Sequence, residues 1–216
     1  MILGIFCAGG FGRETMALAR YINSIYRYWE NIIFVDDVVE ADSVMGAEVW
    51  RSERAFAAKG NIQLVVATGE PRNRKMLYDK IVEAGVEVTK LIAPGATIIG
   101  QTYIPNGCII GACFISDGCT IGINSVVNDG ATLGHDSKIG DHCVVGTRAF
   151  LSGNTRLGNG VYVGVGALIK EENRMDDWSV ASIGSVVYRP VKEGQIVLGN
   201  PAKVIGENEE HTVFHR

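Results

Sequence analysis

A six-residue hydrophobic period runs through the middle of the chain. Every sixth residue is a branched aliphatic over one unbroken stretch: Ile121, Val127, Leu133, Ile139, Val145, Leu151, Leu157, Val163 and Ile169. Glycine often follows directly, and a small residue recurs four places further on. This period fits neither the 3.6 residues of an α-helix nor the alternation of an ordinary strand. It is typical of short straight segments joined by tight corners with the aliphatic residue inward, and it predicts a parallel β-helix.

The period also locates the ends and irregularities of this helix. Ile92, Ile98, Ile104 and Ile110 keep it, but Ile121 follows after 11 residues, which indicates one lost residue and a distorted corner at 114–118. The charged stretch 170–177 lacks the period and is interpreted as a loop or the end of a turn, and 183–187 is interpreted as one more partial coil. We therefore expect a β-helix domain with a C-terminal cap over residues 91–206 and an exposed tail over 207–216.

The first part of the chain has a different pattern. Apolar runs at 2–6, 32–35 and 64–67 predict buried strands, and helices are expected at 13–26 and 72–83. In the second helix Met76, Leu77, Ile81 and Val82 are expected to face inward. Alternating strands and helices favour right-handed crossovers and a parallel sheet. Residues 1–90 are thus predicted to form a small Rossmann-like α/β domain.

A glycine-rich turn, Cys7-Ala8-Gly9-Gly10-Phe11-Gly12, joins the first strand to the first helix. As a dinucleotide motif it is degenerate, because Cys7 occupies the first glycine position. Phosphate can still meet the free N–H groups at the start of a helix. Asp36 and Asp37 end the second strand, where such folds contact a ribose or a base. Either a nucleotide site or a capping domain with a vestigial site follows from this pattern.

The composition indicates which classes of partner and which cell compartment to expect. The net charge is −4 and the cations are scattered, so the pattern does not favour a nucleic-acid partner. The five cysteines form no CxxC pair and read as small apolar fillers in a reducing compartment. No apolar run reaches about 18 residues, and a basic segment before an apolar core is lacking at the start. We expect a cytoplasmic protein without a membrane span.

Histidine is rare, and one histidine stands out. His135 takes the third position of its hexad, should project outward at a corner, and precedes Asp136. An imidazole beside a carboxylate suits a general base, although an exposed surface histidine would show the same pattern. His142 also lies in the β-helix. His211 and His215 fall in the tail and are expected to be solvated.

Three motifs together resemble a known family. They are the Gly-Gly-Phe-Gly turn, Gly134-His135-Asp136-Ser137-Lys138-Ile139-Gly140, and Gly199-Asn200-Pro201-Ala202-Lys203. Over essentially its whole length the chain resembles the left-handed β-helix (hexapeptide-repeat) acyltransferases of the sialic acid O-acetyltransferase and nucleotide-amino-sugar N-acetyltransferase type. The resemblance implies three hexads per coil, so that residue i stacks on residue i+18. It also implies acetyl-CoA as cosubstrate and a homotrimer with the active site between subunits.

The resemblance also implies site residues. His135 would act as the base in direct acyl transfer, Asp136 would orient it, and the Gly153 N–H would bind the oxyanion, unless Gly153 only relaxes a corner. The coenzyme is expected to contact Gly153, Val165, Gly166, Ser182, Pro201 and Lys203. The acceptor is expected to contact Gly9, Gly10, Phe11, Asp36, Asp37, Thr68, Gly69 and Asn128.

One departure and several alternatives remain. Many relatives carry a second histidine where this chain has Val144, and no role passes to Val144 or to His142. The leading hypothesis is an N-acetyltransferase acting on a nucleotide-linked amino sugar for surface glycans such as lipopolysaccharide or capsule. A sialic acid O-acetyltransferase and a non-catalytic structural β-helix are alternatives. A metal hydratase of the γ carbonic anhydrase type needs three histidine ligands. The β-helix offers two, so no metal is expected.

Overall fold

The computed structural model describes residues 1–214 and divides the chain into two compact units. Unit 1 comprises residues 1–69 and 73–91, and unit 2 comprises residues 70–72 and the chain from Ile92 onward. His215, which the sequence assigned to a solvated tail, lies outside the described residues.

Unit 1 is a sheet with three helices. The strands are β1 (Ile2–Phe6), β2 (Asn31–Val35), β3 (Ser43–Val44), β4 (Ala47–Trp50), β5 (Ile62–Val66) and β6 (Glu87–Val88), and the helices are α1 (Gly10–Tyr26), α2 (Ser52–Ala57) and α3 (Pro71–Glu83). They pair in the order β3-β4-β2-β1-β5-β6, and only the β3–β4 pair is antiparallel. The predicted parallel sheet is confirmed. Its central strands are buried on both sides, as is usual for parallel sheets covered by helices.

Some details of unit 1 differ from the prediction. The short elements β3, β4, α2 and β6 were not foreseen, because each has too few residues for a period. Helix α3 buries Ile81 completely, but Met76 and Val82 are more than half exposed, so their predicted inward orientation is wrong. A 13-residue helix with one buried stripe leaves these two positions on its solvent side.

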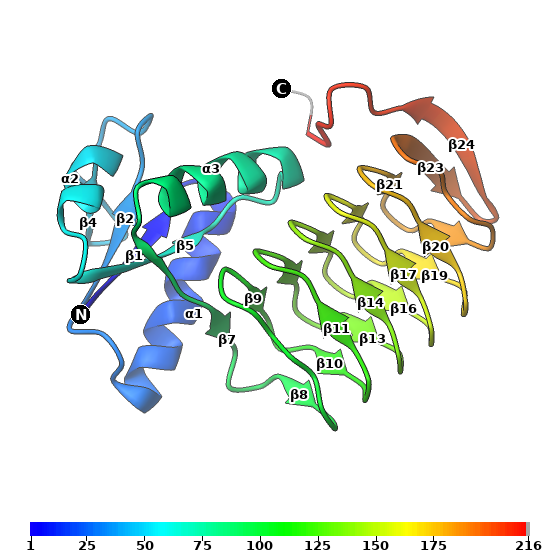
Figure 1. Ribbon diagram of the computed structural model, residues 1–216, viewed down its shortest axis with the longest axis horizontal. Coiled ribbons are helices and arrows are strands. Elements are labelled where there is room, and N and C mark those ends of the chain that lie inside the picture. The colour runs from blue at the N-terminus through cyan, green and yellow to red at the C-terminus, as the bar shows by residue number, and fades with distance from the viewer. Residues whose placement is uncertain (215–216) are drawn as a thin grey trace. The chain divides into compact units, whose positions relative to one another are not determined.

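Unit 2 is a parallel β-helix with three faces (Figure 1). The first face contains β7 (Leu91–Ile92), β9 (Ile109–Ile110), β12 (Val126–Val127), β15 (Val144–Val145), β18 (Tyr162–Val163), β21 (Val180–Ala181), β23 (Gln195–Gly199) and β24 (Ala202–Glu207). The second contains β8 (Thr97–Ile98), β10 (Phe114–Ile115), β13 (Thr132–Leu133), β16 (Phe150–Leu151), β19 (Leu168–Ile169) and β22 (Val186–Val187). The third contains β11 (Thr120–Ile121), β14 (Lys138–Ile139), β17 (Arg156–Leu157) and β20 (Arg174–Met175). The chain visits the faces in this order, and we name the turns between them corner 1–2, corner 2–3 and corner 3–1.

The hydrophobic period becomes the core of this helix. Each aliphatic residue of the period from Ile121 to Ile169 is buried, and between Phe114 and Val187 paired strands are 18 residues apart, as Phe114 and Thr132 are. Ser and Cys side chains at the small positions donate to main-chain carbonyls inside the corners, for example Ser125 Oγ to Gly140 O at 2.9 Å and Cys143 Sγ to Gly158 O at 3.0 Å. These bonds satisfy carbonyl groups that the turns would otherwise bury unpaired.

The distorted corner lies earlier than predicted. Ile115 is fully buried and pairs with Leu133, so 114–118 is a regular strand and turn. The missing residue falls between Ile110 and Ile115, where Cys113 N donates to Gly111 O at 2.8 Å. The register offset from Thr97 to Phe114 is accordingly 17 residues. A phenylalanine beside Ile115 hid the register in the sequence.

The stretch 170–177 is not a loop. It contains β20, which pairs with β17 and buries Met175 in register with the inward aliphatic residues. Ala181 and Val187 continue the same register. An unbranched Met and a small Ala fill the inward position as well as a branched aliphatic does, so the coil persists where the pattern in the sequence fades.

The tail is not simply exposed. β24 extends to Glu207, and Asn208 is buried and donates from Nδ2 to Trp178 O at 3.1 Å. The His211 ring stacks on Trp178 with 4.5 Å between centroids, and Phe214 meets Tyr162 edge-on. Aromatic stacking within unit 2 therefore holds a segment whose polar composition suggested free solvation.

Candidate functional site

His135 and Asp136 form the turn of corner 2–3 between β13 and β14. His135 Nδ1 lies 2.9 Å from Asp136 Oδ2, and both side chains are mostly exposed. Asp136 has a left-handed backbone (φ 58°), which an aspartate tolerates better than most residues. This backbone turns its carboxylate toward the preceding imidazole. With the proton of Nδ1 donated to Asp136, the ring presents Nε2 as the basic nitrogen.

Gly153 lies one coil further along the same corner. A Cβ atom added there would stand 2.5 Å from His135 Nε2 and 2.7 Å from Cε1, so the imidazole rests on the glycine. The main chains are joined here as well, because Asn154 N donates to His135 O at 2.8 Å. The structure thus brings together the three predicted catalytic residues. Because the His135 ring occupies the space of a Cβ atom, any side chain at position 153 would displace the ring.

The N–H of Gly153 differs from equivalent groups on corner 3–1. There a side chain of the next coil caps three successive N–H groups: Asp141 Oδ1 accepts from Ile123 N at 2.8 Å, Asn159 Oδ1 from Asp141 N at 2.9 Å, and Asp177 Oδ1 from Asn159 N at 2.8 Å. Within residues 1–214 the Gly153 N–H donates no hydrogen bond. An uncapped donor beside a basic nitrogen is the arrangement that stabilises an oxyanion in acyl transfer.

The residues expected around the coenzyme lie along a different corner. Val165 and Gly166 form a turn of corner 1–2, and Ser182 follows β21 on the same column. Pro201 lies in the turn between β23 and β24, and Lys203 is exposed on β24. Asn128, expected near the acceptor, also lies on corner 1–2, directly after β12. Within one chain the structure therefore distributes the predicted site over corners 1–2 and 2–3, on either side of the second face.

His142 and Val144 are separated from the His135 corner. His142 is buried on corner 3–1, where its Nδ1 lies 2.9 Å from Asn124 Nδ2. Val144 is buried in β15 on the first face. Since His135 and His142 occupy different corners, they do not share a metal ion. No group of three or more His, Cys, Asp or Glu residues within 1–214 is arranged to hold one.

A second cluster of predicted residues lies at the carboxyl edge of the unit 1 sheet. Gly9 is the N-cap of α1, and Gly10 and Phe11 begin its first turn. A Cβ atom on Gly9 or Gly10 would meet nothing within 4 Å, so packing does not require glycine at either position. Gly12 is different, because a Cβ atom there would collide with the carbonyl of Cys7. Gly12 lets α1 start close to β1, and the two preceding glycines leave the helix N-terminus uncovered.

Cys7 occupies the first glycine position of the dinucleotide motif and has a backbone conformation typical of glycine. It adopts φ 93°, a conformation that glycine accepts more readily, and donates from N to Val35 O at 2.8 Å. Burial and the neighbouring Asp36 raise the pKa of the Cys7 thiol to about 12. The cysteine therefore fills the glycine position as a neutral, partly buried side chain.

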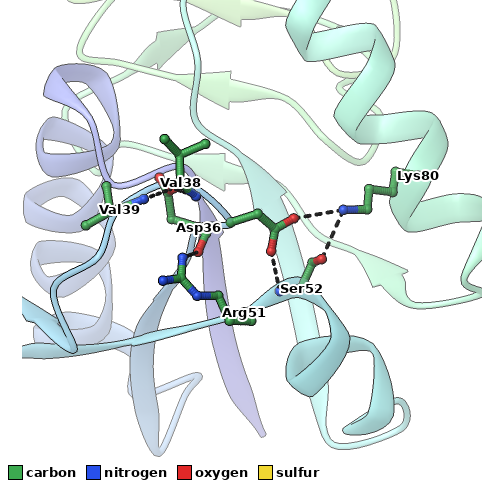
Figure 2. A network of polar contacts seen from close by, with 7 residues as sticks. Asp36, Val38, Val39, Arg51, Ser52 and Lys80 are labelled. Carbon is green, nitrogen blue, oxygen red and sulfur yellow. Dashed lines mark hydrogen bonds and ion pairs between the residues drawn. The ribbon is translucent and has the colours of Figure 1, made fainter.

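Asp36 and Asp37 serve different purposes (Figure 2). Asp36 is buried, and its two oxygens accept main-chain N–H bonds at 2.8–2.9 Å from Ala8, Val38 and Val39. These bonds hold the loop after β1 and the loop after β2 together. The expected contact of Asp36 with a ligand stays a prediction.

Asp37 remains partly open to solvent. Its Oδ1 accepts from Ser52 N and its Oδ2 from Lys80 Nζ, both at 2.8 Å, and Lys80 also donates to Ser52 Oγ at 2.9 Å (Figure 2). Partial burial raises the pKa of Asp37, but the bonds from Lys80 and Ser52 outweigh it and hold the pKa below its usual value of 3.8. Asp37 is thus an oriented carboxylate at the edge of the sheet.

The loop after β5 is organised by a buried arginine. Arg74 is fully buried in α3, and its Nη1 donates to Val66 O and Thr68 O, each at 2.9 Å. Thr68 and Gly69 are held at the same sheet edge as Gly9 and Asp37. The sequence pattern did not predict the roles of Arg74, Lys80 and Ser52. Charged residues within a helical pattern read as solvated, and only the fold shows what they meet.

Comparison with known proteins finds a family match for the first part of the chain. The PglD N-terminal domain family matches residues 2–81. No curated protein sequence matches the chain. Among solved structures, the acetyltransferase domain of PglB from Neisseria gonorrhoeae in complex with acetyl coenzyme A is 28% identical, with a TM-score of 0.88 over 94% of this chain and 98% of that one.

Two further structures agree in fold. WeeI from Acinetobacter baumannii is 24% identical, with a TM-score of 0.88 over 95% of this chain and 100% of that one. A histidine-to-asparagine variant of perosamine N-acetyltransferase from Caulobacter crescentus, in complex with CoA and GDP-perosamine, is also 24% identical, with a TM-score of 0.88 over 96% of this chain and 98% of that one. The expected fold, an α/β domain followed by a left-handed parallel β-helix, is confirmed. Residues 2–81 thus match the PglD N-terminal domain family, and over almost its whole length the chain is similar to an acetyltransferase domain of the left-handed β-helix type.

Proposed function

We propose that this protein transfers an acetyl group from acetyl-CoA to the amino group of a nucleotide-linked amino sugar. The observation that carries the proposal is the arrangement at corner 2–3. There the imidazole of His135, oriented by Asp136, lies against Gly153, whose N–H is uncapped. Acyl transfer needs a base and an oxyanion donor within reach of one carbonyl group, and His135 and Gly153 would supply them.

The chemistry is direct transfer. The sugar nitrogen attacks the thioester carbonyl carbon and gives up a proton to His135 Nε2. The tetrahedral oxyanion accepts a hydrogen bond from Gly153 N–H, while Asp136 stabilises the imidazolium through Nδ1. When the C–S bond breaks, the imidazolium returns its proton to the thiolate of CoA. Bonds and protons balance, and the products are the amide and free CoA.

The assembly we propose is a homotrimer that packs through the second face. The outward positions of this face carry Phe114, Phe150 and Leu168, each more than a third exposed, whereas those of the third face carry Lys138, Arg156 and Arg174. An exposed apolar row on one side of a prism favours a covered interface. Three prisms packed in this way would bring corner 1–2 of one copy against corner 2–3 of the next.

This assembly would complete the site. Acetyl-CoA would lie between His135 and Gly153 of one copy and Val165, Gly166 and Ser182 of its neighbour. Pro201 and Lys203 would line the far end of the same groove, with Lys203 as a point charge for a phosphate. Asn128 of the neighbour would face the sugar.

The nucleotide would bind at the carboxyl edge of the unit 1 sheet. Gly9, Gly10 and Phe11 offer an open helix N-terminus for phosphate, and the oriented carboxylate of Asp37 suits a ribose or base donor. Thr68 and Gly69 would close the other side. GDP-perosamine is the ligand of the Caulobacter crescentus relative, which supports this acceptor class. We assign the product to surface-glycan synthesis.

A reducing compartment suits this reaction. The five cysteines are free, which fits the cytoplasm. No helix in residues 1–214 has the length and apolar character needed to cross a membrane. Burial raises the pKa of Cys7 and Cys143 to about 12 and of Cys113 to about 11. These thiols stay neutral in the folded protein, so a thiol reagent at pH 8 would report CoA release with little background.

The test is thiol release from acetyl-CoA with UDP-, dTDP- and GDP-linked amino sugars and free sialic acid. His135→Ala and the surface variant Glu209→Ala are assayed beside the wild type. Release with one nucleotide amino sugar, lost only in His135→Ala, is the expected result. Release with sialic acid alone would replace the proposal by O-acetylation, and no acetyl-CoA binding at all would leave a structural β-helix.

A further inference from the structure

A buried glutamate ends the loop that follows β5. Glu70 is only 7% exposed, and it comes directly after Thr68 and Gly69, which are expected to contact the acceptor. Removing a carboxylate from water is unfavourable unless hydrogen-bond donors surround it. The proposed reaction gives this carboxylate no part, so its burial needs another explanation.

Donors to Glu70 come from the other end of the chain. Its Oε2 accepts hydrogen bonds from Val213 N at 2.9 Å and from Phe214 N at 3.0 Å. Two residues after Glu70, Arg72 Nη1 donates to Glu210 O at 3.0 Å. All three bonds lie within unit 2. The C-terminal tail therefore holds the residues at the start of α3.

The tail is folded where it makes these contacts. Asn208 is buried, its Oδ1 accepts from Thr212 N at 2.8 Å, and its main-chain O accepts from His211 N at 3.1 Å. The ring contacts of His211 and Phe214 described above hold the same segment on the β-helix. The main chain thus presents two successive N–H groups in a fixed direction, which suits a carboxylate acceptor.

The loop after β5 is consequently fixed at two points. Arg74 holds its first part, since Nη1 donates to Val66 O and Thr68 O. Glu70 holds its end through the bonds from the tail. Releasing the tail would remove two hydrogen bonds from a buried carboxylate, which then has to move toward water. Thr68 and Gly69 lie between the two fixed points, so we expect their conformation to depend on the tail.

We propose that the C-terminal tail, acting through Glu70, positions Thr68 and Gly69 for the nucleotide sugar. This inference rests on the function proposed above, which places these two residues at the acceptor. Glu70 and the tail are positioning groups, because they act on the loop and not on the ligand. A ligand that needs the fixed loop binds more weakly when only a fraction of the molecules has the tail in place.

Proline substitutions test the contact one N–H group at a time. Val213→Pro deletes a donor to Glu70 without changing the charge, since proline has no amide hydrogen. Glu209→Pro is the matched control. It falls at the second position of the turn closed by His211 N and Asn208 O, where proline is favoured, and within residues 1–214 the Glu209 N–H donates no hydrogen bond. Glu209→Ala accounts for the charge that this control removes.

The measurements separate the acceptor from the coenzyme. UDP, dTDP, GDP and acetyl-CoA are titrated by calorimetry, and KM and kcat are determined with the amino sugar that the thiol-release assay selects. We expect Val213→Pro to weaken nucleoside diphosphate binding and to raise the KM of the nucleotide sugar about threefold to tenfold. The kcat and the acetyl-CoA affinity should stay within about twofold of the wild type. Amide hydrogen exchange in residues 66–70 should become faster in Val213→Pro and stay unchanged in both position-209 variants.

Three results would overturn the inference. One is unchanged nucleotide affinity and KM in Val213→Pro, which would leave the proposed function intact. Another is an equal loss of acetyl-CoA affinity, which would show that the tail supports the whole protein. The third is a wild type that binds no nucleoside diphosphate. A wild type that binds a nucleoside diphosphate more tightly than Val213→Pro, but releases no thiol with any acceptor, would support the inference and remove the proposed reaction instead.

Discussion

The imidazole of His135 rests on the Cα atom of Gly153, and no side chain fits between them. The distance of 2.5 Å from Nε2 to a Cβ atom built on Gly153 is well inside van der Waals contact. Gly153, which has the uncapped N–H, is therefore also the residue against which the His135 ring packs. Any side chain at position 153 would change the direction of Nε2 while leaving the N–H in place.

Gly153→Ala tests this relationship. The backbone at Gly153 is not left-handed, so alanine is tolerated by the main chain but displaces the ring. We expect kcat to fall about 10- to 100-fold through misplacement of the base, with the KM for acetyl-CoA nearly unchanged. Steady-state kinetics decide it, with Gly206→Ala as control because a Cβ atom there meets nothing within 4 Å. An alanine variant with full activity would show that the ring has room to move.

We expect His135 and Asp136 to contribute to turnover by different amounts. His135→Asn removes the base and should lower kcat by about 10²- to 10⁴-fold. Asp136→Asn keeps the shape but loses the carboxylate, so a smaller loss is expected. Turnover of each variant is compared with its acetyl-CoA affinity, which should stay at the wild-type value because the fold is unchanged. Equal losses in turnover and affinity would indicate a collapsed corner.

The second face is predicted to hold the trimer. Phe150→Glu places a charge in the centre of its exposed apolar row and should dissociate the assembly. Light scattering coupled to gel filtration would show a folded monomer without acetyltransferase activity, because the proposed site is completed by a second copy. Arg156→Glu on the third face is the control and should remain trimeric. A wild type that is monomeric at micromolar concentration would refute the assembly.

The Lys80–Asp37 pair predicts a pH-dependent contribution to stability. The folded pKa of Asp37 is below 3.8, so the pair stabilises the protein above that pH, and the effect is lost as the pH falls through the folded pKa. Lys80→Met should reduce the free energy of unfolding by less than about 1 kcal/mol at pH 7, since the pair is partly exposed.

Urea unfolding at a series of pH values measures this effect. The difference between wild type and Lys80→Met should shrink below pH 3.8, while Lys192→Met, which alters an exposed lysine of unit 2, should show no such trend. A difference that stays constant down to pH 3 would mean that Asp37 is not the partner that matters.

The tail is predicted to stabilise unit 2 through aromatic contacts. His211→Ala removes the ring that stacks on Trp178 and should lower the free energy of unfolding by about 1 kcal/mol. Removing the stacked ring should also shift the Trp178 fluorescence. Glu209→Ala, on an exposed neighbour, should change neither property. Unchanged fluorescence in His211→Ala would show that the tail is free in solution.

Much of the fold could be predicted from the sequence, because every coil of a β-helix has the same requirements at equivalent positions. Each inward position of the β-helix needs an apolar side chain and each corner needs a small residue, so the period fixed the register from Ile121 to Ile169. The register was lost at Ile115 and Met175, where a neighbouring phenylalanine or an unbranched side chain weakened the pattern. His135 was found because it stands at an outward position beside a carboxylate.

Only the tertiary structure determined which groups each functional side chain contacts. Asp36 and Asp37 are adjacent and identical in the sequence, yet main-chain N–H groups occupy one and a lysine from α3 orients the other. The packing of the His135 ring against Gly153 is likewise a contact between successive coils. Periodicity is a local property and determines which face a residue takes. Side-chain contacts depend on residues far apart in the chain, and only folding brings these together.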